Sequence, residues 1–83
     1  MIIIAQDKSL VNMDRVSYIG INSTTHPKFS QCTDKLILKY EIVAEDGDKY
    51  YSIGTYDTPE EAKRYIKLIS QGIEERWNTC EVS

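Results

Sequence analysis

The sequence predicts an α+β domain in which an antiparallel sheet of about four or five strands carries one C-terminal helix on one face. Three observations lead to this prediction. Short apolar stretches precede the middle of the chain, Asp46-Gly47 is a hairpin turn signal, and a capped amphipathic segment follows Thr58. No strand–helix alternation and no glycine-rich phosphate loop are present, so a parallel nucleotide-binding fold is disfavoured. At 83 residues we expect one domain spanning 1–83.

The helix is predicted from Thr58 to about Trp77. Thr58, Pro59 and Glu61 match an N-cap, a first helical position and the glutamate of a capping box. Gly72, on the flank of the helix, either permits a close backbone approach or is merely tolerated. At about 100° per residue one face carries an apolar stripe that we expect to face the core: Ala62, Ile66, Ile69, Ile73 and Trp77.

Three short segments before residue 23 have strand character. Met1 to Ala5 is apolar and predicts a first strand, and Leu10 to Met13 predicts a second. Val16 to Asn22 alternates apolar and small or polar residues, so Ile19 and Ile21 should point inward. These segments would supply the strands that flank the central hairpin.

The polar run from Ser23 to Asp34 shows no clear period and is predicted to be a long loop. It contains His26, the only histidine, without a second residue at a recognised ligand spacing, so we expect a solvated histidine, no metal and no cofactor. Cys32 and Cys80 lack a CxxC spacing and a secretory signal. We therefore expect two reduced thiols, with Cys80 in a frayed tail.

The strongest strand pair runs from Lys35 to Glu45 and from Asp48 to Tyr56, joined by a two-residue turn. With Asp46 and Gly47 as the turn, Glu45 pairs with Asp48, and the strands share one apolar face that would seat the helix: Leu36, Leu38, Tyr40, Ile42, Tyr51, Ile53 and Thr55. A one-residue slip at the turn would exchange the two faces.

The opposite face of this hairpin is the candidate binding site. By the same count it carries Ile37, Val43, Tyr50 and Tyr56, and the chain is rich in tyrosine, with six. Tyrosine is enriched at protein interfaces because it contributes apolar area and a hydroxyl with few rotamers to order. Either other strands cover this face, or it is an exposed patch for a partner protein or for a second copy of the chain.

Composition excludes several function classes. The net charge is −3, the isoelectric point is about 5.0, and no run of Lys or Arg exceeds two residues, which disfavours nucleic-acid binding. The apolar run at Met1 to Ala5 is too short for a signal peptide or a membrane span, so we expect a cytoplasmic protein. No nucleophile, base and metal set assembles in the sequence, and we expect no enzyme activity.

Both ends of the chain carry a resemblance. It opens with Ile2-Ile3-Ile4-Ala5-Gln6-Asp7-Lys8 leading to Asn12-Met13-Asp14, and it later reads Ile53-Gly54-Thr55-Tyr56-Asp57-Thr58-Pro59-Glu60-Glu61-Ala62-Lys63. In these stretches it resembles a loose class of short, uncharacterised proteins of Gram-positive bacteria and their phages. The resemblance implies a bacterial or prophage origin, implies no known activity and transfers no functional residue.

Two functional hypotheses follow. The first is a small non-catalytic protein-interaction module, of adaptor or inhibitor type, that binds through the outer hairpin face or the loop from Ser23 to Asp34. The alternative is a single-stranded nucleic-acid-binding module, with bases stacking on tyrosines and two lysines nearby: Tyr18, Tyr50, Tyr56, Lys39 and Lys49. Net acidity opposes the alternative.

Overall fold

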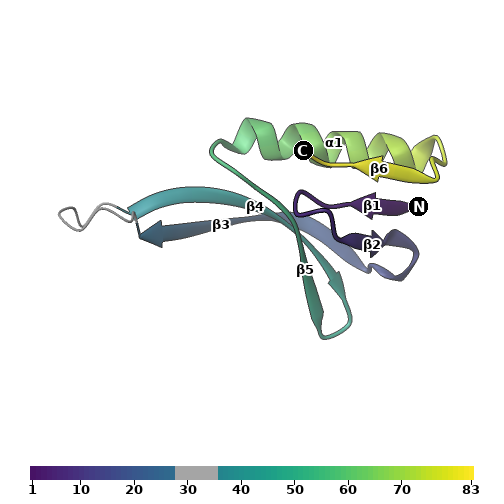
Figure 1. The fold of residues 1–83 in the computed structure, drawn as a ribbon, viewed down its shortest axis with the longest axis horizontal. Helices are drawn as coiled ribbons and strands as arrows, with labels where there is room; N and C mark the ends of the chain where they lie inside the picture. The colour runs from purple at the N-terminus through teal and green to yellow at the C-terminus, as the bar shows by residue number, and fades with distance from the viewer. Residues whose placement is uncertain (28–35) are drawn as a thin grey trace.

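The computed structural model describes residues 1–27 and 36–83, and the side-chain surroundings of residues 1–23 and 38–83. Within these residues the chain forms six strands and one α-helix, which confirms the α+β class (Figure 1). The strands form two three-stranded sheets, with orders β2-β1-β6 and β3-β4-β5, whereas a single sheet was predicted. The helix contacts three strands of the second sheet and β6 of the first.

The smaller sheet joins the two ends of the chain. Strand β1 (Ile2–Ile4) is antiparallel to β2 (Leu10–Asn12) and parallel to β6 (Thr79–Glu81). Both predicted N-terminal strands are confirmed, but the predicted frayed tail is wrong. Cys80 and Val82 are buried in the core while the residues between and beside them are exposed. A strand this short carries too few alternating residues to be recognised before its partner is known.

The larger sheet is antiparallel, with β3 (Tyr18–Pro27), β4 (Leu36–Asp46) and β5 (Lys49–Tyr56) in chain order. Strand β3 runs to Pro27, opposite Leu36, so the prediction of a loop from Ser23 is wrong as far as Pro27. The polar residues there pair with β4, and a backbone ladder needs no apolar period. Residues 28–35 lie outside the described part of the chain. Strands β3 and β4 extend well beyond β5 (Figure 1).

The β4–β5 turn is shifted by one residue from the prediction. Asp46 pairs with Lys49, which makes Gly47 and Asp48 the turn, and the predicted pairing of Glu45 with Asp48 is wrong. Gly47 has φ +61° and is the one turn residue with positive φ, as expected when glycine is the first central residue of a type II′ turn. Partners therefore move by two residues, so the two faces are not exchanged and the expectation that a one-residue slip would exchange them is wrong. Ile42 stays on the core face as predicted.

A β-bulge at Ile53 interrupts the β4–β5 ladder. Val43 pairs with Ser52 and Ile42 pairs with Gly54, so Ile53 is an extra residue on β5. Beyond it, alternate side chains exchange faces, which places Tyr56 on the core face. The loop after β1 completes the hydrogen bonding at the bulge. The Gln6 backbone N–H donates to the Ile53 carbonyl at 2.7 Å, and the Thr55 N–H donates to Gln6 Oε1 at 2.9 Å.

Helix α1 (Pro59–Glu74) begins as predicted and ends earlier. Thr58 is the N-cap, its Oγ1 accepts the Glu61 N–H at 3.3 Å, and Pro59 is the first helical residue. Arg76 has φ +58° and stops the helix. Its N–H donates to the Ile73 carbonyl at 3.3 Å and the Trp77 N–H donates to the Gly72 carbonyl at 2.8 Å, the two bonds of a Schellman motif.

This C-cap changes the end of the predicted stripe. Trp77 turns back over Gly72, and a Cβ added at Gly72 would lie 2.8 Å from the Trp77 ring and 3.0 Å from Met1 Sδ. Gly72 therefore permits a close approach. Ile73, predicted to lie in the core, is 52% exposed, because Trp77 and Met1 pack over the neighbouring flank instead.

The main core lies between the helix and the two sheets. Ile69 is 1% exposed, and the Tyr56 and Tyr65 rings stack with centroids 5.0 Å apart and an interplanar angle of 21°. The buried side chains of this core come from both sheets, the helix and the C-terminal segment: Ile3, Val11, Ile42, Ala44, Ile53, Tyr56, Ala62, Ile69, Cys80 and Val82. From β3, Ile19 and Ile21 pack against them and are only partly buried.

Two isoleucines of α1 form a matched pair for mutagenesis. Ile69→Ala should lower the free energy of unfolding by about 2 to 5 kcal/mol because it leaves a cavity. Ile73→Ala, at an exposed position one turn later, should change it by less than roughly 0.5 kcal/mol.

Thr58→Ala should lower the free energy of unfolding by about 1 kcal/mol, because the N-cap hydrogen bond to the Glu61 N–H is lost. Urea denaturation followed by circular dichroism measures all three, and equal effects at 69 and 73 would contradict this packing.

Candidate functional site

The candidate site is the face of the β3-β4-β5 sheet that points away from the helix, called the outer face here. Its residues follow from the pairing register, which sets three cross-strand rows: Tyr18–Glu45–Tyr50, Gly20–Val43–Ser52 and Asn22–Glu41–Thr55. Tyr50 is 67% exposed and Tyr18 is 51% exposed, while Asn22 and Ser52 are also exposed. The first row therefore presents two solvent-facing tyrosines on either side of a glutamate.

The four residues predicted for this site have different positions. Tyr50 lies on the outer face and is exposed, as predicted. Val43 lies on the same face but is only 6% exposed. Tyr56 is 4% exposed on the core side, so the prediction that it points outward is wrong, and the cause is the extra residue at Ile53. Ile37 pairs through its backbone with His26 in β3, and its side chain lies outside the described residues.

Tyr18 explains why Val43 is covered. A Cβ added at Gly20 would overlap the Tyr18 ring, so this ring lies along its own strand directly above Gly20. Gly20 is the cross-strand partner of Val43, which places the ring beside the valine side chain. The Tyr18 side chain thus lies against the sheet and is still half-exposed, so part of its ring is available to a ligand.

Carboxylates set the charge of the outer face. Glu41 and Glu45 lie on either side of Val43 along β4, and Ser52 Oγ donates to Glu41 Oε2 at 2.9 Å. The Glu45 carbonyl accepts the Ser17 N–H at 2.8 Å, which holds the strand backbone at this residue. The three described rows contain no Lys, Arg or His. Lys39, nearer the start of β4, forms an ion pair with Asp57.

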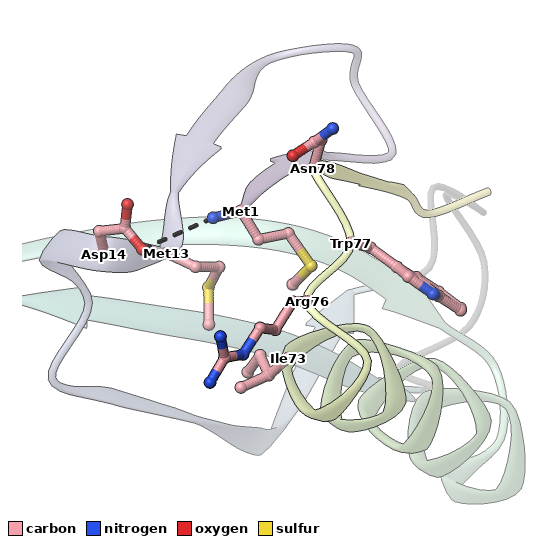
Figure 2. Close-up of a pocket in the computed structure, with 7 residues that line it drawn as sticks. All are labelled: Met1, Met13, Asp14, Ile73, Arg76, Trp77 and Asn78. Carbon is pink, nitrogen blue, oxygen red and sulfur yellow. Dashed lines mark ion pairs between the residues drawn. The ribbon is translucent and has the colours of Figure 1, made fainter.

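A second feature is a pocket of about 370 Å³ between the N-terminus and the end of α1 (Figure 2). Figure 2 shows Met13 and Ile73 near its centre and Asp14 and Asn78 at its border, with the Arg76 guanidinium close to Ile73. The Met1 amino group lies 3.5 Å from Asp14 Oδ1. The pocket combines apolar side chains with groups of both charges: Met1, Met13, Asp14, Ile73, Arg76, Trp77 and Asn78.

Sequence reasoning missed this pocket because its walls come from three separate segments. The parallel pairing of β1 with β6 brings the first residue next to residues 77 and 78. The only sequence signal was Ile73, an apolar residue at the end of the helical stripe. It is exposed because its side chain lines the pocket. The lining pairs no nucleophile with a base and presents apolar side chains beside charged groups of both signs.

The described residues contain no group of three His, Cys, Asp or Glu side chains that could hold a metal ion. His26 belongs to β3 and not to a loop, and Cys32 lies outside the described residues. Cys80 is a free, buried thiol, and burial raises its pKa, so the protonated form predominates at neutral pH. No helix in the described part of the chain is long and apolar enough to cross a membrane.

Comparisons of the chain with protein-family models, with curated proteins and with solved structures find no match. The geometry and charge of the surfaces described above are therefore the basis for inferring a function.

The Tyr56 hydroxyl is buried and has no hydrogen-bond partner among the described residues. Burial, followed by the nearby Tyr65 and Glu61, raises the pKa of Tyr56 to about 12 from an ordinary value of 10.0. The folded state thus favours the protonated phenol. This preference stabilises the fold fully below pH 10 and is lost as the pH rises from 10 toward 12, because the unfolded chain releases the proton first.

Tyr56→Phe keeps the ring and removes the unpaired hydroxyl, so at pH 7 it should leave stability unchanged or raise it by about 1 kcal/mol. Between pH 9 and 12 the wild type should lose on the order of 2 kcal/mol more than the variant. Denaturation midpoints of both proteins across this range provide the test. Parallel pH profiles would show that Tyr56 does not titrate differently in the folded state.

Proposed function

We propose that this protein is a small non-catalytic protein-interaction module, of adaptor or inhibitor type, that binds a protein through its outer face. The observation that carries the proposal is the row formed by Tyr18, Glu45 and Tyr50, which exposes two aromatic rings on the side of the sheet away from the helix. Aromatic side chains with a polar end are enriched at protein interfaces and are costly to leave in water without a partner.

The support for this surface is that the fold does not need these rings for its main core. Tyr56, Tyr65 and Tyr51 pack in or against the core beneath α1, whereas Tyr50 stands outside it on the opposite face. The partner is another protein or a second copy of the chain. We also propose a bacterial or phage origin, on the basis of the resemblance, and a cytoplasmic location, on the basis of the sequence.

The nucleic-acid alternative has less support. Its stacking set consisted of Tyr18, Tyr50 and Tyr56, and Tyr56 is buried. Lys39 is paired with Asp57, and the described outer-face rows carry two glutamates and no cation. Phosphates would be repelled at the surface where the bases would have to stack.

Photo-crosslinking tests the proposal. A benzoyl-phenylalanine placed at position 50 in cells producing the protein should yield discrete protein adducts that excess wild-type protein competes away and excess Tyr50→Ser does not. The same probe at Leu10, which is 69% exposed on the other sheet, is the matched control. Adducts of equal yield and pattern at both positions would contradict the proposal. Sedimentation of the isolated protein shows whether the adduct partner is a second copy.

Tyr50→Ser should keep the thermal midpoint within about 2 °C, because an exposed side chain contributes less than roughly 0.5 kcal/mol. A large fall in stability would mean that Tyr50 belongs to the packing of the monomer and would remove the basis of the proposal.

A further inference from the structure

We propose that the partner segment that binds the outer face is extended and basic, with two Arg or Lys side chains four residues apart. This inference rests on the proposed function and adds the chemistry of the ligand. It starts from the position of two carboxylates, Glu41 and Glu45, on one side of one strand.

The spacing of these carboxylates determines the spacing in the partner. Residues four apart in a strand are separated by roughly 13 Å and point to the same face. An extended segment lying along β4 has the same repeat, so basic residues at its positions i and i+4 would each meet one glutamate. The residue midway between them, at i+2, would face Val43, which is only 6% exposed, so this position needs no large apolar side chain.

Aromatic rings make the Glu45 end selective for a cation. Tyr18 and Tyr50 are direct cross-strand neighbours of Glu45, one on each side. Adjacent strands lie about 5 Å apart, so a cation above Glu45 lies within the ~6 Å range over which aromatic faces attract cations. A guanidinium would thus meet one carboxylate between two neighbouring tyrosine side chains, whereas an acidic side chain would be repelled by Glu45.

No intramolecular cation competes for this position within the described structure. Arg15 forms an ion pair with Asp46. Lys39 lies on the same side of β4 as Glu41, two residues before it, but forms its described ion pair with Asp57 and not with either glutamate. Glu45 forms no ion pair in the described structure, and the Ser17 contacts to this residue engage its backbone carbonyl and leave its carboxylate to an incoming charge. At the other end, the Ser52 hydroxyl donates to Glu41 Oε2 at 2.9 Å and so fixes the direction of the carboxylate that would meet the second basic residue.

The test is a nuclear magnetic resonance titration of the ¹⁵N-labelled protein with three synthetic peptides. The first is a seven-residue Gly/Ser/Ala peptide with arginines at its second and sixth positions. The second has glutamates at those positions, and the third has its two arginines adjacent. We expect the first peptide to shift the amide signals of the outer-face rows, the third to bind more weakly, and the glutamate peptide to cause no shift at saturation. Raising the salt concentration should weaken binding.

Single substitutions test whether Glu45 and Tyr50 take part in binding the peptide. Glu45→Gln and Tyr50→Ser should each weaken binding of the first peptide by roughly three- to tenfold, and Tyr50→Phe should retain it because the ring face remains. Leu10→Ser on the other sheet is the matched control and should bind as the wild type does. The dispersion of each spectrum shows that the variant is folded.

Two results would overturn the inference. One is equal binding of the arginine and glutamate peptides. The second is a set of amide shifts confined to acidic residues elsewhere, such as Glu60 and Glu61 at the start of α1. Binding of the first peptide that is unchanged in Glu45→Gln would count against the inference in the same way. If crosslinking from position 50 succeeds while no basic peptide binds, the proposed function stands and the basic character of the partner is wrong. If crosslinking is equal at both positions, the proposed function itself fails.

Discussion

The extra residue at Ile53 is the constraint on which the rest of the structure depends. Without the bulge, β5 would keep one alternation from Tyr50 to Tyr56, and both tyrosines would point away from the helix. With it, Tyr56 stacks on Tyr65 and belongs to the core, while Tyr50 stays exposed. Gln6 pairs with two backbone groups on the free edge of β5 beside the bulge, and this contact also ties the small N-terminal sheet to β5.

Features set by neighbouring residues were predictable from the sequence. Thr58, Pro59 and Glu61 form their cap within one helical turn, and Gly47 marks a turn because few other residues accept positive φ there. The turn itself was misplaced by one residue, since glycine can be either the first or the second central residue of a hairpin turn. Ile42 and Ile53 were nevertheless assigned to the core correctly, because the shift moves each cross-strand partner by two residues and keeps the side chains on the same face.

Features set by distant residues were not predictable. Strand β6 depends on pairing with β1 at the other end of the chain, and the bulge depends on Gln6 arriving from the preceding sheet. The candidate site was therefore only partly recovered. The outward position of Tyr50 was predicted correctly, Tyr56 was assigned to the wrong face, and the positions of Tyr18 and Glu45 beside Tyr50 became visible only with the strand register.

Two tyrosine–glycine pairs show how one local arrangement serves opposite purposes. In both β3 and β5 a tyrosine ring lies over a glycine two residues earlier or later, Tyr18 over Gly20 and Tyr56 over Gly54, where a Cβ would overlap the ring or lie 2.5 Å from its hydroxyl. On the core side this arrangement accompanies the stacking of Tyr56 on Tyr65 and leaves the Tyr56 hydroxyl without a hydrogen-bond partner among the described residues. On the outer side the Tyr18 ring lies over Gly20, the cross-strand partner of Val43, and stays half-exposed. Because a glycine beneath the ring is needed in each case, the composition of the strands that form the core also shapes the surface available for binding.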